Sequence, residues 1–150
     1  MHPLLSEDAA CVARVCAAQR FGVLATYGAG QPYASLVAVV ASAALEAFVF
    51  ATLRGTRKFA NLAACPQAAL LLDSRAHQPD DVCVAEAVTA LGTVRELLGG
   101  ERAAWAAQYV ARHPQLQAFV QRPDCALCVL QVAQYQLSRH FVPSVSEGAE

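Results

Sequence analysis

The hydrophobic positions of this chain fall into short runs that turn residues separate. Runs of this length, rich in Val, Leu, Phe and Ala, predict strands rather than long helices. We expect six strands, over residues 21–26, 32–40, 45–53, 68–73, 82–97 and 125–141. Two glycines between the first two runs predict a hairpin, and an isolated Gly92 predicts a bend in the fifth strand. The first two strands are apolar on both faces, which predicts that both faces are covered, by a helix or by a partner subunit.

Helical spacing occurs in four segments between these runs, over residues 6–19, 56–64, 101–112 and 114–120. Ser6 and Thr56 are suited to cap the first two helices, and Pro66 and Pro114 mark breaks. Trp105 lies on a helical stripe and is expected in the core. Strands in meander order with few helices predict a mainly β (α+β) fold, a six-stranded antiparallel barrel with helical covers. We expect one domain, ordered over about residues 7–141, and a tail over 143–150.

Composition narrows the class of protein. The chain has 150 residues, of which 56% are hydrophobic and 15% charged, and its net charge is -1. So few polar residues favour an oligomer that hides apolar surface, with a homodimer as the simplest case. The near-neutral balance predicts no nucleic-acid footprint. Residues 34–53 are apolar enough to suggest a membrane span, but Glu46 interrupts them and two strands explain them better. The first residues do not resemble a signal peptide, so we expect a cytoplasmic protein without membrane contact.

The cysteines and histidines do not form a recognisable metal site. Six cysteines without an export signal predict free thiols. Cys125 and Cys128 form a C-x-x-C pair, but on a strand this odd spacing points the two side chains to opposite faces. The four histidines are scattered, so no metal is expected. His77 and His140 are the only acid–base candidates, and neither is assigned a catalytic role.

The segment Arg54-Gly55-Thr56-Arg57-Lys58 places three cations together, and Lys58 is the only lysine of the chain. It lies between an expected strand and an expected helix, with Thr56 as N-cap. Cations in the first turn of a helix cost about 0.3–1 kcal/mol each, because the helix N-terminus is itself positive. A bound phosphate reverses that sign and accepts hydrogen bonds from the same groups. The alternative is that the cations are solvated loop charges.

Several short segments, in this order and spacing, carry a resemblance to a known family. They are FGVLAT (residues 21–26), GQPYAS (30–35), FVFAT (48–52), TRKFANL (56–62) and residues 69–75, followed by residues 79–82, 90–92 and 113–114. Over about residues 21–137 the chain resembles the pyridoxamine 5'-phosphate oxidase-like family, whose members are FMN-binding split β-barrels.

The resemblance implies a homodimer that holds two FMN molecules at its interface. It implies that Thr52, Thr56, Arg57 and Lys58 grip the flavin phosphate, whereas Arg54 has no counterpart there. It also implies that Ser35, Leu36 and Val37 line the isoalloxazine ring and the ribityl chain, largely through backbone groups. Asn61 matches the family's Arg-Lys-x-x-Asn-Leu pattern, and either contacts the ligand or orients the helix by local hydrogen bonding.

The chain departs from pyridoxamine phosphate oxidase itself at its C-terminal end, where the family's substrate-holding tryptophan, arginine and histidine motif is missing. Oxidation of vitamin B6 is therefore not expected. Three readings stay open. The first is an FMN-dependent oxidoreductase with a small-molecule electron donor and acceptor and no assigned catalytic residue. The second is a non-catalytic flavin- or haem-binding module, and the third is an interaction domain that has lost its ligand.

Overall fold

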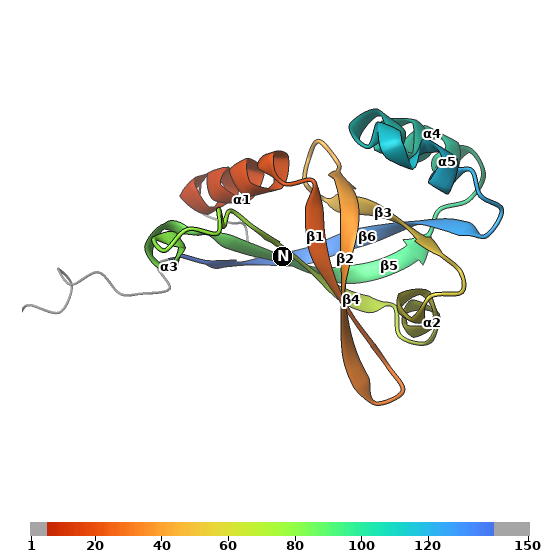
Figure 1. Ribbon diagram of the computed structural model, residues 1–150, viewed down its shortest axis with the longest axis horizontal. Helices are drawn as coiled ribbons and strands as arrows, with labels where there is room; N and C mark the ends of the chain where they lie inside the picture. Colours follow the sequence, from red (N-terminus) through yellow and green to blue (C-terminus); the bar gives the residue numbers. More distant parts are fainter. Residues whose placement is uncertain (1–5, 140–150) are drawn as a thin grey trace, which may run out of the picture.

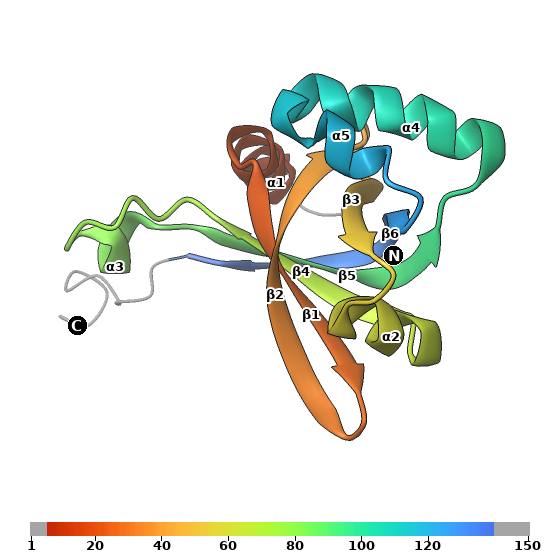
Figure 2. The same ribbon diagram turned by 45° about the vertical axis from the view of Figure 1, so that its right-hand side comes forward.

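Six antiparallel strands form a closed barrel in the computed structural model, which describes residues 6–139 (Figures 1 and 2). The strands are β1 (Phe21–Gly28), β2 (Gln31–Ala41), β3 (Ala47–Leu53), β4 (Gln67–Asp73), β5 (Ala87–Glu96) and β6 (Cys125–Ser138). Around the barrel their order is β1-β2-β3-β6-β5-β4, and β4 pairs with β1 to close it. The predicted six-stranded antiparallel barrel is confirmed. The tail expected over residues 143–150 lies outside the described residues.

Helices cover two sides of this barrel. They are α1 (Ser6–Ala18), α2 (Arg57–Ala64), α3 (Asp81–Val84), α4 (Gly99–Arg112) and α5 (Gln117–Val120), with a 3-10 turn, η1 (Pro114–Leu116), before α5. Figures 1 and 2 show α1, α4 and α5 on one side and α2 on the other, beside the projecting β1–β2 hairpin. Within the described part of the chain, no helix has the length and apolar character needed to cross a membrane.

Side chains pack into two separate cores because alternate residues of a strand point to opposite faces. The inner core fills the barrel with residues such as Phe48, Phe50 and Leu130, and α1 adds Val12 and Val15. The outer core lies between the other face of β2, β3 and β6 and the helices α4 and α5. Its members include Val49, Leu127 and Tyr109, with Trp105 packed against them as the sequence predicts.

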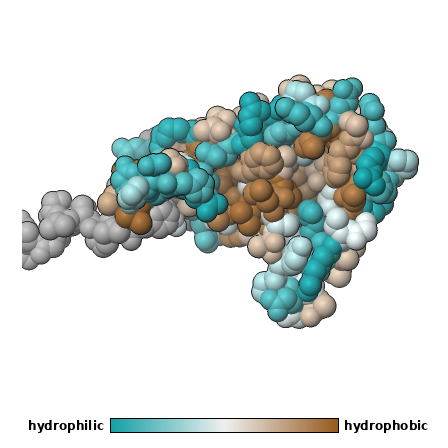
Figure 3. All heavy atoms as spheres, viewed as in Figure 1, coloured by the Kyte–Doolittle hydropathy of each residue, from teal (hydrophilic) through white to brown (hydrophobic). Residues whose placement is uncertain are grey.

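The outer face of β1 and the neighbouring part of β2 is left bare. Buried and exposed positions alternate along β1, so only its inner face is covered in this chain. Phe21 is 54% exposed and Leu36 is 68% exposed. Figure 3 shows a continuous apolar patch over this region, between the helical side of the molecule and the hairpin. The expectation that both faces of β1 are covered is therefore not met within one chain.

Two arginines join the C-terminal ends of α1 and α4. The Nη2 of Arg112, at the end of α4, donates to the carbonyl oxygens of Ala17 and Gln19 at 3.3 and 2.8 Å, at the end of α1. In return, Arg20 donates to the carbonyl oxygen of Arg112 at 2.8 Å. Helix C-termini carry partial negative charge and unpaired carbonyl groups. Arg112 therefore stabilises the end of α1, and Arg20, which follows α1, stabilises the end of α4.

The fifth strand begins later than the sequence predicts. The sequence predicts residues 82–86 in this strand, but residues 81–84 form α3 and the strand starts at Ala87. The carboxylate of Asp81 accepts hydrogen bonds from the backbone N–H groups of Ala76, His77 and Gln78, at 2.8 to 3.3 Å for the nearest oxygens. These hydrogen bonds hold the preceding loop against the start of α3. Local side-chain hydrogen bonding of this kind competes with strand pairing.

The other boundaries shift by a few residues. The third strand begins at Ala47 rather than at residue 45, because the Ser42 hydroxyl accepts from the N–H groups of Glu46 and Ala47 and closes a turn. Glu46 lies in that turn. The bend expected at Gly92 is confirmed as an irregularity in the β5–β6 register between Leu91 and Gly92.

Candidate functional site

The N-terminus of α2 lies directly after β3 and is capped by Thr56, as the sequence predicts. The Thr56 hydroxyl accepts a hydrogen bond from Phe59 N at 3.4 Å and donates to the Leu53 carbonyl at 2.8 Å. It also lies 2.8 Å from the hydroxyl of Thr52 at the end of β3. The junction between strand and helix is thus fixed by side-chain hydroxyls as well as by the backbone.

Arg57 and Lys58 in the first turn of α2 have no charged partner among the described residues. The first turn of α2 contains no acid either. Their backbone N–H groups also have no acceptor within the described part of the chain, as is usual for the first turn of a helix. Two side-chain cations and free N–H donors therefore occur at one point, which is the donor set that binds phosphate.

Arg54 does not belong to this donor set. Its guanidinium forms an ion pair with Glu96 at 2.8 Å, and it lies over the ring of Phe59 with 5.9 Å between the guanidinium carbon and the ring centre. The charge of Arg54 is thus balanced by β5. This ion pair distinguishes Arg54 from Arg57 and Lys58, which have no charged partner among the described residues.

Thr52 and Asn61 are buried and bond to protein groups. Thr52 is 2% exposed, and its hydroxyl contacts Thr56 and the Leu53 carbonyl. Asn61 is 6% exposed and donates from Nδ2 to the hydroxyl of Thr26 on β1 at 3.1 Å. Of the two roles that the sequence leaves open for Asn61, this hydrogen bond fits the one in which Asn61 orients the helix, although its partner lies on β1 and not nearby in the sequence. Thr52 in turn supports the N-cap.

The predicted residues of β2 point in different directions. Val37 lies in the inner core, and Leu36 points outward from the bare face. The hydroxyl of Ser35 is buried and has no hydrogen-bond partner among the described residues. Ser35 lies two residues from Tyr33, roughly 7 Å along the strand, and Tyr33 contacts Arg57. The structure therefore brings β2 and the α2 N-terminus together. Arg57 and Lys58, which have no charged partner among the described residues, and the orphaned Ser35 hydroxyl fit a ligand with a phosphate, whereas the exposed Leu36 side chain lies on the opposite face of β2.

Tyr33, Thr26 and His113 lie in segments that carry the family resemblance, but the sequence assigns none of them a role in the site. The Tyr33 ring lies under the Arg57 guanidinium, with 5.2 Å between the guanidinium carbon and the ring centre. Thr26 bonds Asn61, as described above. His113 is 6% exposed and its Nε2 is 2.8 Å from the Val39 carbonyl oxygen. That contact gives His113 a structural partner inside the fold. No local pattern in the sequence indicates these three contacts, because each joins distant segments.

Of the two histidines that the sequence offers as acid–base candidates, His77 lies within the described residues. His77 lines a small hollow of about 150 Å³, together with Phe21, Leu36 and Arg75 among others. This hollow adjoins the bare face beside Leu36. His77 has a backbone φ of 60°, in the left-handed region, and belongs to the loop wound around Asp81. His140 lies outside the described residues.

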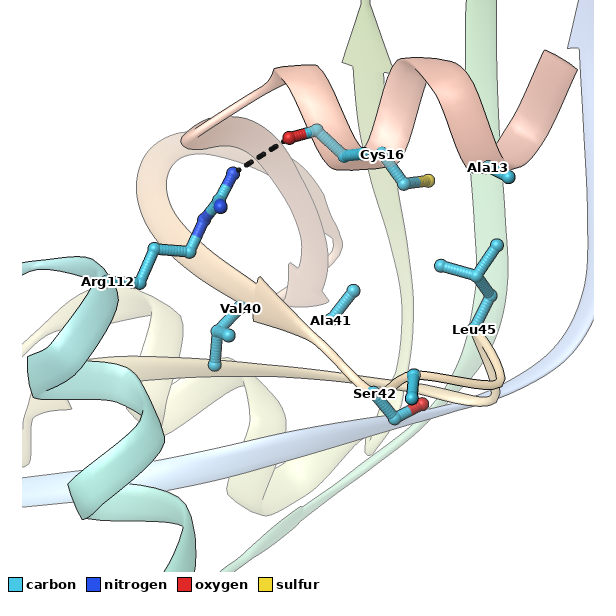
Figure 4. A pocket seen from close by; sticks show the side chains of 9 residues that line it. Ala13, Cys16, Val40, Ala41, Ser42, Leu45 and Arg112 are labelled. Atoms are coloured by element: carbon cyan, nitrogen blue, oxygen red, sulfur yellow. Dashed lines mark hydrogen bonds between the residues drawn. The ribbon is translucent and has the colours of Figure 1, made fainter.

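A second hollow of about 340 Å³ lies between α1, the end of β2 and the turn that follows it (Figure 4). Small apolar side chains line most of it, and the Cys16 side chain and Arg112 complete the wall. None of the predicted site residues reaches this hollow. Figure 4 shows the guanidinium of Arg112 turned toward the α1 carbonyl that it bonds, so its position is explained by the helix ends.

All six cysteines are free. Cys128 faces the inner core, and Cys125 has the opposite strand parity, so the C-x-x-C pair points to opposite faces as predicted. Burial raises the pKa of the Cys16 thiol to about 11 and that of Cys128 to about 12. These thiols are therefore protonated at neutral pH, which makes them weak nucleophiles and poor metal ligands.

Comparisons with known proteins agree with this architecture. A family model described as pyridoxamine 5'-phosphate oxidase matches residues 9–139. No curated protein sequence matches the chain. Among solved structures, a heme binding protein from Mycobacterium smegmatis is 23% identical with a TM-score of 0.80, over 95% of this chain and 57% of that one. This chain thus spans little more than half of that relative.

Two further structures are similar over most of both chains. HutZ, a heme storage protein from Vibrio cholerae, is 19% identical with a TM-score of 0.73, over 87% of this chain and 92% of that chain. An FAD-binding protein from Mesorhizobium loti is 15% identical with a TM-score of 0.70, over 89% and 94%. At these identities the likeness establishes the fold alone.

Proposed function

The chain belongs to the pyridoxamine 5'-phosphate oxidase family, and from this premise we propose that it is an FMN-binding flavoprotein and an oxidoreductase of unassigned substrate. The observation that carries the proposal is the free cation pair at the N-terminus of α2. Arg57 and Lys58 lack acidic partners among the described residues, whereas neighbouring Arg54 is paired with Glu96. Unpaired cations beside free helix N–H groups favour a dianionic phosphate over a neutral ligand.

Each residue has a distinct part in this proposal. Arg57 and Lys58 donate charge-assisted hydrogen bonds to the phosphate, and Thr56 holds the first turn of α2 in place. Ser35 offers its unpartnered hydroxyl, and Leu36, whose side chain points to the opposite face of β2, lines the flat ring through its backbone groups. When bound, FMN supplies the transfer of a hydride or of electrons between a donor and an acceptor. The chain's own residues bind and cover it.

We also propose a homodimer. Phe21 and Leu36 expose apolar surface on the bare face of β1 and β2, next to the proposed cofactor residues. Patches of this kind on a folded chain commonly mark interaction sites. A second copy placed against this face would shield both the apolar surface and a bound ring from water.

The test is a titration of the purified protein with FMN, followed by flavin absorbance and fluorescence. We expect Arg57→Ala and Lys58→Ala each to weaken binding by roughly 1.5–3 kcal/mol, the scale of a hydrogen bond to a charged group. Arg54→Ala is the matched control, because it removes the same charge from a residue paired with Glu96. Unchanged FMN binding in both Arg57→Ala and Lys58→Ala would exclude the site.

A haem-binding or non-catalytic module is the second candidate, because two structurally similar proteins are described as heme-binding and heme-storing. The visible spectrum of the purified protein distinguishes the candidates. Two flavin bands support FMN, and a single intense Soret band supports haem. Flavin bands without turnover of any reduced nicotinamide donor support a binding module rather than an enzyme.

A further inference from the structure

We propose that Tyr33 and Asn61 are positioning residues, which hold α2 on the β1–β2 hairpin in the one register that presents Arg57 to the phosphate. The inference rests on the proposed phosphate site. It assigns a task to two residues that need not touch the ligand. Its evidence is a pair of matched contacts between the helix and the hairpin.

The two contacts fit together because the spacing of side chains on α2 matches that on the β1–β2 hairpin. Thr26 on β1 and Tyr33 on β2 are direct partners across the antiparallel ladder, so their side chains point to the same face. Arg57 and Asn61 are four residues apart on α2, so they too share one face. Arg57 meets the ring of Tyr33, and Asn61 meets the hydroxyl of Thr26. Two neighbours on the helix thus meet two neighbours on the hairpin.

Gly28 makes this close approach possible. A Cβ at position 28 would lie 2.0 Å from Oδ1 of Asn61 and 3.3 Å from the Asn61 Cα, so any side chain there would force the Asn61 amide out of its present position. Thr26 also donates to the carbonyl oxygen of Tyr33 at 3.5 Å, which links the two contacts through β2. The hairpin is therefore shaped to receive Asn61.

The contacts also fix the helix register. A shift of α2 by one residue would bring Lys58 to the Tyr33 ring and Leu62 to the Thr26 hydroxyl. Leu62 belongs to the inner core and would leave the hydroxyl of Thr26, which is 3% exposed, without its amide partner. The buried hydroxyl would keep only its 3.5 Å contact with the Tyr33 carbonyl, and loss of a buried hydrogen bond is unfavourable, so the observed register is preferred.

The nature of the partner keeps Arg57 available. An aromatic ring attracts a guanidinium through its negative face but carries no net charge. A carboxylate in the same place would neutralise Arg57, as Glu96 does for Arg54. Tyr33 therefore limits the orientations of the Arg57 side chain and leaves its charge free for an anion.

The experiment compares FMN with riboflavin, which has the same ring and ribityl chain but no phosphate. Tyr33→Leu removes the ring, Tyr33→Ile does so with a residue suited to strands, and Tyr33→Phe keeps the ring. The strength of an exposed cation–π contact predicts that Tyr33→Leu and Tyr33→Ile lower the FMN-to-riboflavin affinity ratio about two- to fivefold. Tyr33→Phe should keep the wild-type ratio. In an Arg57→Ala background, Tyr33→Leu should have no further effect on it.

The outcomes separate the two proposals. If wild-type protein prefers FMN over riboflavin, and folded Tyr33→Leu or Tyr33→Ile protein retains the full preference, the positioning role is wrong and the phosphate site stands. A loss that is equal for both flavins would also overturn it, because that result indicates general damage to the fold. If wild-type protein binds FMN and riboflavin equally, the phosphate site itself fails.

Discussion

Replacement of Thr56 by alanine tests how far one hydroxyl holds the strand–helix junction. The substitution removes three contacts of Oγ1, to Phe59 N, to the Leu53 carbonyl and to the Thr52 hydroxyl. Loss of a Thr N-cap costs about 1 kcal/mol. The Thr52 hydroxyl, which is buried, keeps only its 3.3 Å contact with the Leu53 carbonyl, and we add roughly 0.5 kcal/mol for its lost partner. The free energy of unfolding should therefore fall by about 1.5 kcal/mol.

Urea unfolding followed by far-UV circular dichroism measures this loss. With an m-value of about 2 kcal/mol per M, the midpoint should fall by roughly 0.7 M while m stays constant. Thr56→Ser is the matched control, because serine keeps the hydroxyl and caps helices at least as well. If Thr56→Ala unfolds at the wild-type midpoint, or if Thr56→Ser loses as much, the hydroxyl does not carry the stability assigned to it.

Two further predictions concern other parts of the fold. Gly92→Ala would place a Cβ 1.9 Å from the carbonyl oxygen of Gln131, so we expect a loss of about 1–3 kcal/mol by thermal unfolding, whereas Gly100→Ala, with no atom within 4 Å, should not destabilise. The hydrogen bond from Arg14, then that from Cys11, lowers the pKa of Glu86. Because the folded pKa of Glu86 is lower than the unfolded one, the ionised carboxylate stabilises the fold. This contribution is present above the unfolded pKa of about 4.3 and is lost as pH falls through the lower folded pKa. Glu86→Gln should therefore flatten the acid side of the pH–stability curve, and an unaltered curve would contradict this role.

The sequence predicts the barrel well because most of its strands appear as short apolar runs between turn residues, a pattern that is typical of strands and not of long helices. It also predicts the N-cap at Thr56, since capping depends only on neighbouring residues. The start of the fifth strand is wrong for a local reason. Val82 and Val84 alternate with polar or small residues as a strand would, but Asp81 gathers the N–H groups of the preceding loop and starts a helix.

The candidate site is predictable only in part. Arg57 and Lys58 are visible in the sequence because cations at a helix N-terminus are unusual there. Their separation from Arg54 depends on Glu96, which is 42 positions away and reaches Arg54 only through the folding of β5. The contact between Tyr33 and Arg57 depends on the register of the hairpin against α2. Such long-range contacts have no local signature in one sequence.

The position of β6 between β3 and β5 has a consequence for the order of folding. Ala47 pairs with Gln131, so the ladder between β3 and β6 joins residues 84 positions apart. The hairpin of β1 and β2 can form from nearby residues, whereas β3 has no partner on its far edge until β6 arrives. Closure of so long a loop loses much chain entropy before contacts compensate, which slows folding of β-rich topologies. Until that last strand inserts, the apolar edge of β3 is open to pairing with other chains, so the rate of β6 insertion sets how long a nascent molecule is prone to aggregate.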